Sequence, residues 1–311
     1  MSTLRHALDD YLALRHAMGF KMHNVHTLLS QFIVFLEQHE TAFITTDLAV
    51  RWALPPQHVQ PAEWARRLRV VRGFAQYHSA VEPRTEIPPP ELLPYRPQRR
   101  APYLYSDAEI AQLLAAARQL PSVTGLRACT YATVFGVLAV TGMRLSEPLA
   151  LDNDDVALDD GLLTIRHTKF RKSRCLPLHP TTQQALGRYV DVRNRVYPIP
   201  QSPAFFVSEQ GTRLTTWAVR ATFVRLSRQI GLRGPRDSHG PRLHDLRHRF
   251  AVQTLVRWYQ AGVDVDRHLS ELSTYLGHVK VSDTYWYVSA TPELLALATQ
   301  RLEHRQRRLP L

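Results

Sequence analysis

Leu243-His244-Asp245-Leu246-Arg247-His248 is the stretch from which the fold and chemistry of this 311-residue chain are inferred. Leu276-Gly277-His278 and Tyr287 follow it, and Thr141-Gly142-Met143-Arg144-Leu145-Ser146-Glu147 lies far upstream. These segments supply guanidinium, imidazole and phenol groups. Multi-donor cations beside an oxygen nucleophile indicate chemistry on a phosphate, because a phosphoryl transition state concentrates negative charge on its non-bridging oxygens.

His244 and Arg247 are three residues apart at the start of a helix predicted over 244–260. Side chains at that spacing share one helix face, so both can reach a phosphate placed near the helix N-terminus. The alternative is a solvated surface pair, which is common at helical spacing.

Arg144 follows an apolar helix predicted over 126–141 and has Glu147 three residues later. Because Leu145 and Leu149 flank it, we expect Arg144 to be partly buried and to need an anionic partner. That partner is a bound phosphate or, structurally, Glu147. The two interpretations are compatible, since a carboxylate can orient the guanidinium that binds a substrate.

Residues 162–178 are predicted to form two short strands around a basic turn, with Phe205-Phe206-Val207 as a further strand. The turn holds Lys169, Arg171, Lys172 and Arg174. A lysine at its tip can enter a DNA groove or donate a proton to a leaving oxygen. The alternative is a solvated turn that only contacts phosphates.

His278 follows Gly277, which should end a helix over 267–276 and leave the imidazole projecting from a turn. The alternative is a buried, hydrogen-bonded histidine. Tyr285 and Tyr287 are two residues apart, so on one helix they face nearly opposite directions. Only one of them can be a nucleophile, and the other should pack or stack with Trp286.

Composition narrows the class of partner. The chain is 44% apolar and carries a formal net charge of +12, mainly from arginine. This predicts a globular protein with a polyanionic partner, for which nucleic acid is favoured over an anionic membrane surface. Cys129 and Cys175 have no metal-ligand spacing, and neither a signal peptide nor a membrane span is legible. We therefore expect a soluble, cytoplasmic protein without a metal site.

The chain is predicted to be mostly α (α+β) and to have two domains. Residues 1–86 form an all-helical N-terminal domain, residues 87–102 a proline- and arginine-rich linker, and residues 103–311 a mostly helical domain with a small antiparallel sheet. The N-terminal helices are expected over 3–18, 28–36, from 46, and 61–77.

Exposed basic residues on predicted helices, linker and turn are candidate DNA contacts, although a solvated basic face and an interdomain strap are the plain alternatives. The candidates are Arg66, Arg69, Arg99, Arg100, Arg171, Lys172, Arg220 and Arg225.

Together these motifs resemble the tyrosine recombinase (phage integrase) family over about residues 103–290. The likeness rests on Thr-Gly-Met-Arg-Leu-Ser-Glu, the basic hairpin, His-Asp-Leu-Arg-His, Leu-Gly-His and a tyrosine nine residues after that last histidine. The resemblance implies that Arg144 and Arg247 clamp the scissile phosphate and that His278 adds a hydrogen bond. Tyr287 would attack the phosphorus, forming a 3′-phosphotyrosyl bond and releasing a 5′-hydroxyl.

The resemblance assigns the remaining roles as well. Lys169 would be the general acid, with Lys172 as the alternative because the turn lacks the usual glycine or asparagine. His244 would assist proton transfer at the nucleophile, and Glu147 would support the site. No metal or ATP is implied, since the phosphotyrosine conserves the phosphodiester energy.

The implied partner is double-stranded DNA, and the N-terminal domain resembles the family's core-binding domain by pattern only. The last helix would pack into a neighbouring protomer, giving a tetramer on paired sites, or else into its own core. The Tyr-Trp-Tyr end resembles recombinases of transposons and other integrative elements. The alternatives are a tyrosine-type topoisomerase and a non-catalytic DNA-binding regulator or accessory protein of the same fold.

Overall fold

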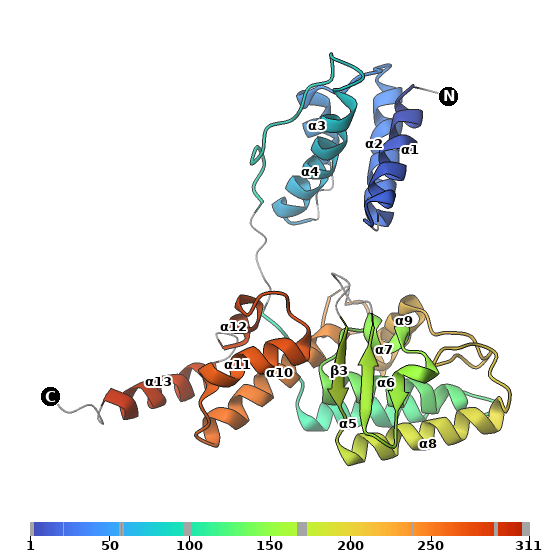
Figure 1. Ribbon diagram of the computed structural model, residues 1–311, viewed down its shortest axis with the longest axis vertical. Helices are drawn as coiled ribbons and strands as arrows, with labels where there is room; N and C mark the ends of the chain where they lie inside the picture. Colours follow the sequence, from blue (N-terminus) through green and yellow to red (C-terminus); the bar gives the residue numbers. More distant parts are fainter. Residues whose placement is uncertain are drawn as a thin grey trace. The chain divides into compact units, whose positions relative to one another are not determined.

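The computed structural model describes residues 3–20, 22–55, 57, 59–95, 101–166, 173–237, 239–288 and 292–306. The chain divides into two compact units, residues 1–100 and 101–311, which we treat separately (Figure 1). None of the helices in these ranges is long and apolar enough to cross a membrane.

The N-terminal unit contains the expected helices. They are α1 (Thr3–Ala17), α2 (His23–Gln38), α3 (Thr46–Ala53) and α4 (Pro61–His78). Thr45 caps α3 by accepting a hydrogen bond from the Leu48 amide, and Pro61 opens α4, where its missing N–H costs nothing. The helices bury a shared apolar core that includes Phe32 and Phe74.

The second unit is mostly helical. Its helices are α5 (Asp107–Arg118), α6 (Leu126–Thr141), α7 (Ser146–Ala150), η1 (Asn153–Asp155, a 3₁₀ turn), α8 (Pro180–Val196), α9 (Thr216–Gln229), α10 (Leu243–Gln260), α11 (Val265–Leu276), α12 (Ser282–Val288) and α13 (Pro292–Gln306). Ser106 and Glu109 form the capping box expected at the start of α5.

The sheet corrects one prediction. Strands β1 (Val156–Ala157), β2 (Leu162–Ile165) and β3 (Arg174–Pro177) pair antiparallel in that order, with Leu163 opposite Leu176. The strand predicted at 205–207 does not join them. Ala204 and Val207 form only isolated bridges, and the apolar run is buried in the helical core instead.

Helix α8 had no clear sequence signal. Few of its residues are apolar and fully buried, Leu186 and Tyr189 among them, so no broad apolar stripe marks it in the sequence. His179 accepts a hydrogen bond from the Thr181 amide at its N-terminus, where Pro180 occupies the first turn. The local caps, rather than an apolar stripe, mark where this helix begins.

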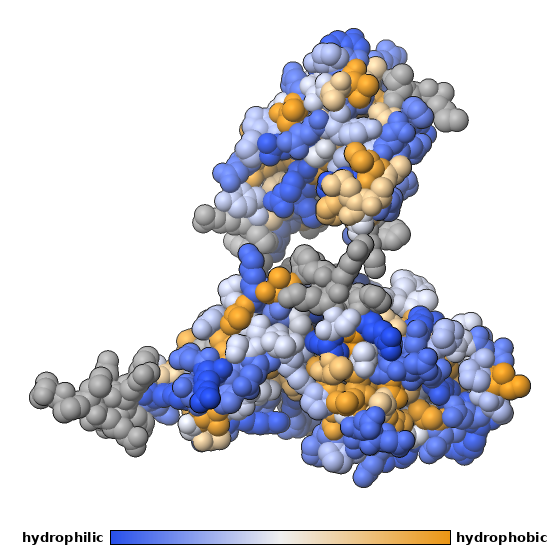
Figure 2. Space-filling model, viewed as in Figure 1, coloured by the Kyte–Doolittle hydropathy of each residue, from blue (hydrophilic) through white to orange (hydrophobic). Residues whose placement is uncertain are grey.

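Helix α10 connects two apolar clusters. Its first turn places Leu243 and Leu246 in the cluster built around α5, α6, α8 and α9, while Ala251 and Leu255 belong to the cluster with α11–α13. In Figure 2 hydrophobic residues also gather at the surface between the strands and α8, and the rest of that face is mainly hydrophilic. Because α10 is anchored at both ends, its N-terminal turn is a rigid support for polar side chains.

Candidate active site

Arg144 lies in a tight turn after α6. Gly142, with a φ of 61°, ends the helix in the left-handed region, and α7 begins two residues after Arg144. Glu147 accepts hydrogen bonds from the Arg144 amide (2.9 Å) and from its Nη1 (3.1 Å). The expected ion pair is therefore present, and it orients a guanidinium that is still partly exposed.

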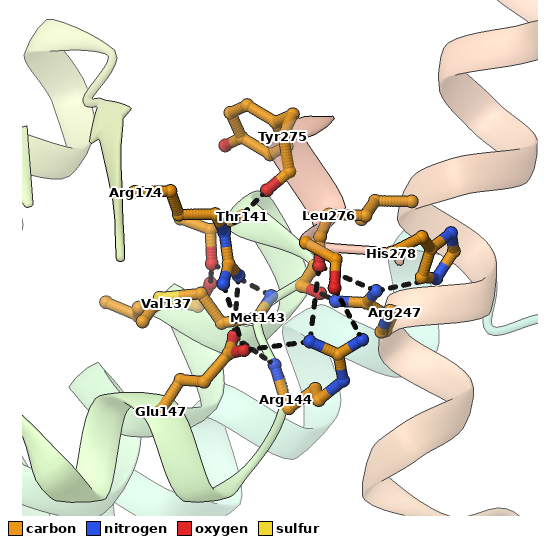
Figure 3. Close-up of polar contacts among 12 residues, drawn as sticks. Val137, Thr141, Met143, Arg144, Glu147, Arg174, Arg247, Tyr275, Leu276 and His278 are labelled. Carbon is orange, nitrogen blue, oxygen red and sulfur yellow. Dashed lines mark hydrogen bonds and ion pairs between the residues drawn. The ribbon is translucent and has the colours of Figure 1, made fainter. Parts of the chain in front are cut away.

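Arg247 is the most completely buried cation of the described site, with 1% of its surface exposed. Its Nη1 donates to the Gly142 carbonyl (2.9 Å) and its Nη2 to the Leu276 carbonyl (2.8 Å). Arg144 reaches the same turn, donating to the carbonyls of Gly277 (3.0 Å) and Leu276 (3.5 Å). One stretch of main chain thus orients both arginines (Figure 3).

His278 contacts Arg247 directly, with Nη2 2.8 Å from Nε2, and its Nδ1 lies 2.7 Å from Oγ1 of Thr284. A guanidinium can only donate, so Nε2 accepts and Nδ1 carries the proton that Thr284 accepts. Burial, together with the charges of Arg247 and Arg144, lowers the pKa of His278 to about 4. The imidazole is therefore neutral at pH 7.

His244 projects from the first turn of α10 and remains exposed. The protein packed around it and the nearby Arg247 charge lower its pKa. Below it Asp245 is buried and accepts hydrogen bonds from the Arg242 amide and guanidinium, both at 2.8 Å, which fixes the start of the helix. His248, one turn on, has its ring 4.7 Å from that of His244.

Tyr287 and Tyr285 face different environments on α12, as their spacing predicts. Tyr287 is 3% exposed, whereas Tyr285 is 52% exposed. The Tyr287 ring stacks on that of His278, with centroids 5.9 Å apart, and packs against His248 at 5.4 Å. Burial lowers the pKa of Arg247, and a hydrogen bond with the Tyr287 phenol opposes that effect. Tyr287 is thus the tyrosine of α12 that packs beside His278, the residue in contact with Arg247.

Arg174 and His248 were not singled out by the motifs. Arg174, expected in the basic turn of the hairpin, begins β3 and is 11% exposed at its side chain. Its Nη2 lies 2.8 Å from Oε2 of Glu147, and its Nε donates to the Tyr275 carbonyl (2.8 Å). His248 is buried and its Nδ1 has no hydrogen-bond partner among the described residues. Only its place in His-Asp-Leu-Arg-His could have signalled it.

The other predicted residues fall into two groups. Lys169, Arg171, Lys172, Arg99 and Arg100 lie outside the described residues. Arg220 and Arg225 are exposed on α9, and Arg66 and Arg69 are exposed on α4, where Arg66 pairs with Glu63 at 2.6 Å.

Two arginines set the charge state of the buried Glu147 carboxylate. Burial raises the pKa of Glu147, but hydrogen bonds and charge from Arg174 and Arg144 outweigh it and hold that pKa below its usual range. Glu147 is therefore an anion held between two cations. No group of three or more possible metal ligands occurs among the described residues.

Comparison with known proteins finds similar sequences over most of the chain. The model of the phage integrase family matches residues 104–293. A putative integrase/recombinase, y4rB, of Sinorhizobium fredii is 50% identical over 98% of this chain and 98% of its own. The tyrosine recombinase XerD of Caulobacter vibrioides is 31% identical over 78% of this chain and 75% of its own.

Solved structures agree at the level of the fold. The Tn1549 transposon integrase, solved in complex with circular intermediate DNA, aligns with a TM-score of 0.66 at 18% identity over 96% of this chain and 99% of its own. The fold is that of a tyrosine recombinase. The chain belongs to the phage integrase family and is a site-specific recombinase, an enzyme that cleaves and rejoins DNA strands.

Proposed function

We propose that Tyr287 is the nucleophile of this recombinase. Its phenol oxygen would attack the scissile phosphorus, form a 3′-phosphotyrosyl bond and expel the 5′-oxygen, which leaves as a hydroxyl after protonation. The observation that carries the assignment is that the buried Tyr287 ring stacks on His278, which in turn contacts the buried Arg247. No other described tyrosine of α12 has that environment, since Tyr285 points to solvent.

Arg144 and Arg247, hereafter the clamp arginines, would bind the non-bridging oxygens of the phosphate. Their attachment to the carbonyls of Leu276 and Gly277 supports this role, because donors fixed before the reaction stabilise developing charge without reorganising. His278 would add a hydrogen bond once the phosphate replaces it as the acceptor for Arg247. Glu147 would orient Arg144.

Proton transfers complete the cycle. His244, exposed at the entrance of α10, would take the proton of the Tyr287 phenol, and its lowered pKa leaves it neutral and able to accept. Lys169, or alternatively Lys172, would protonate the leaving 5′-oxygen. A substrate in which sulfur replaces the leaving 5′-oxygen tests this role, because a thiolate leaves without a general acid. It should restore cleavage in a variant that lacks the general-acid lysine, but not in variants of the other site residues.

The partner we propose is double-stranded DNA. The basic residues of α9 and α4 support this, and so do structural relatives such as XerH, solved bound to its difH substrate. Residues 1–86 would act as the core-binding domain and residues 87–102 as the linker. Such an enzyme would work in the cytoplasm and serve a mobile element.

A tetramer on paired sites is the assembly we propose, by likeness to a lambda integrase solved as a tetramer on a Holliday junction. In the structure α13 packs on α10 of its own chain, and its Leu294 is fully buried. Exchange of α13 between protomers would therefore require this helix to leave its own core when the tetramer forms.

A nicked suicide substrate tests the proposal, because the leaving fragment is lost and the covalent adduct accumulates. The sequence of this substrate is taken from fragments of the source genome that bind to the protein in a selection experiment. We expect an adduct with wild type and Tyr285→Phe, and none with Tyr287→Phe. An adduct that survives Tyr287→Phe contradicts the assignment. No adduct with any variant favours the non-catalytic regulator, and relaxation of plasmids that lack the site favours the topoisomerase.

A further inference from the structure

Arg174 is the basic residue whose environment departs furthest from expectation. It begins β3, yet its side chain leaves the sheet and reaches two separate turns of helix, Glu147 at the start of α7 and the Tyr275 carbonyl at the end of α11. We propose that Arg174 is a positioning residue with two effects. It offsets the negative charge of Glu147, so that the positive charge of Arg144 still acts on the substrate, and it holds the main chain that orients both clamp arginines. This inference rests on the proposed role of Arg144 and Arg247 in holding the scissile phosphate.

The first part of the argument concerns charge. Glu147 is buried and lies 3.1 Å from Arg144, so an isolated pair of the two would be neutral and would attract a phosphate weakly. Arg174 contacts both carboxylate oxygens, at 2.8 Å and 3.1 Å. Two guanidiniums on one carboxylate leave a net positive charge, so Arg144 keeps its electrostatic effect on the developing oxyanion.

The second part concerns geometry. Arg174 Nε donates to the Tyr275 carbonyl at 2.8 Å, and the carbonyls of the next two residues are those that orient Arg144 and Arg247. Gly277 passes directly over the Arg174 guanidinium, where a Cβ would lie only 2.7 Å from Nη1. Figure 3 shows the Arg174 side chain between Glu147 and the main chain of Tyr275. Arg174 therefore braces the main chain on which both clamp arginines depend.

Two other roles would give different results. Arg174 could simply stabilise the fold, in which case its loss lowers stability without a specific effect on the reaction. It could also act through the basic hairpin that precedes β3, in which case its loss impairs protonation of the leaving oxygen.

A double-mutant cycle distinguishes our proposal from a purely structural role. We would measure single-turnover cleavage of the suicide substrate by wild type, Arg174→Gln, Glu147→Gln and the double variant, with the melting temperature and DNA affinity of each. We expect Arg174→Gln to slow cleavage by about 10- to 100-fold, the range typical of groups that orient a reacting residue. In the Glu147→Gln background the effect should be smaller, because no buried carboxylate remains to be neutralised and only the contact with the Tyr275 carbonyl is lost.

Two further variants sharpen the readout. Arg174→Lys should recover part of the rate, since it keeps the charge but cannot reach both turns. Arg213→Gln is the matched control: Arg213 also binds main-chain carbonyls, of Leu149 and Leu151, and pairs with Asp152, but it does not contact the clamp arginines. Its cleavage rate should stay close to that of wild type.

A substrate with a bridging 5′-phosphorothiolate tests the hairpin route. We expect Arg174→Gln to remain slow on it; restoration of the wild-type rate would overturn our proposal in favour of the hairpin. Additive effects in the cycle, with lowered melting temperature, would overturn it in favour of a structural role. If Arg174→Gln cleaves as fast as wild type, this inference alone is contradicted. If wild type itself forms no adduct, the proposed function is overturned and this inference with it.

Discussion

Arg247 donates a hydrogen bond to Nε2 of His278 across 2.8 Å, although the two residues are 31 positions apart in the chain. The imidazole nitrogen that faces the site is therefore an acceptor occupied by a guanidinium. In the proposed reaction a phosphate that takes this N–H would displace His278 as its acceptor. His278 would then have to carry a proton on Nε2 to bind the phosphate itself.

We expect His278→Phe to slow suicide-substrate cleavage by about 10² to 10³, the effect of losing one donor to a developing oxyanion. His278→Gln should recover part of this loss, because its amide can still donate. The matched control is His268→Gln, a change at a half-buried histidine of α11 that pairs with Glu271. A wild-type rate in His278→Phe would contradict the phosphate contact.

Arg247→Lys should reduce both stability and cleavage. An ammonium is a single point charge, and it cannot replace a planar fork that binds Gly142, Leu276 and His278 together. We expect a loss of cleavage of about 10²-fold or more and a lower melting temperature. Arg195→Lys, at an exposed position of α8, should leave both unchanged. Equal effects of the two substitutions would contradict the assignment of Arg247 as a clamp arginine.

The stability of the protein should fall in mild acid. Burial lowers the pKa values of His248 and His278 to about 4, below the ordinary value of 6.5. Between these values the unfolded chain binds protons that the folded chain does not, so stability is full above pH 7 and is lost as the pH falls from 6.5 toward 4. We expect a loss of about 1–2 kcal/mol from each histidine at pH 5.

Urea unfolding at pH 7 and pH 5 measures this dependence. His248→Phe keeps the aromatic contacts with Trp286 and Tyr287 but removes one titrating group. Its loss of stability between the two pH values should therefore be smaller than that of wild type. A profile as steep as that of wild type would show that His248 is not buried in its neutral form.

Gly277→Ala and Gly262→Ala form a matched pair. Both glycines have a φ of 69°, but an added Cβ at Gly262 meets nothing within 4 Å, whereas at Gly277 it meets the Arg174 guanidinium at 2.7 Å. We expect Gly262→Ala to cost about 1 kcal/mol of stability through backbone strain alone, with little change in cleavage. Gly277→Ala should cost more and should also slow cleavage. Equal behaviour would show that the close approach to Arg174 is unimportant.

DNA binding should depend on salt through the exposed arginines of α9. If Arg220 and Arg225 contact phosphates, each change to glutamine should reduce the slope of log affinity against log salt by about 0.9, without changing sequence preference. Fluorescence anisotropy at several salt concentrations measures the slope. An unchanged slope would remove that residue from the DNA interface.

Several parts of the site could be predicted because they depend on local spacing. Glu147 lies three residues from Arg144 and pairs with it, and His244 and Arg247 share the first turn of α10. The two-residue offset also separated Tyr287 from Tyr285 correctly. Helical periodicity is a property of short segments, so sequence alone carries it.

Features that depend on distant contacts were not predictable. Arg174 resembled its neighbours in a basic turn, and only the fold brings it to Glu147, which lies 27 residues earlier in the chain. The run at 205–207 has strand-like composition, but burial in the helical core prevailed over that propensity. Strand β1 has only two residues, too few to show an alternating pattern.

The carbonyl oxygen of Leu276 accepts hydrogen bonds from both clamp arginines. Every amino acid supplies that oxygen, so replacing the Leu276 side chain leaves the acceptor chemically intact. Inserting or deleting a single residue in this turn would instead move it away from both guanidiniums at once. The site should therefore tolerate the exchange of Leu276 for another apolar residue, which keeps its buried position, far better than a change of chain length, a property that mutational scanning with matched insertions would reveal.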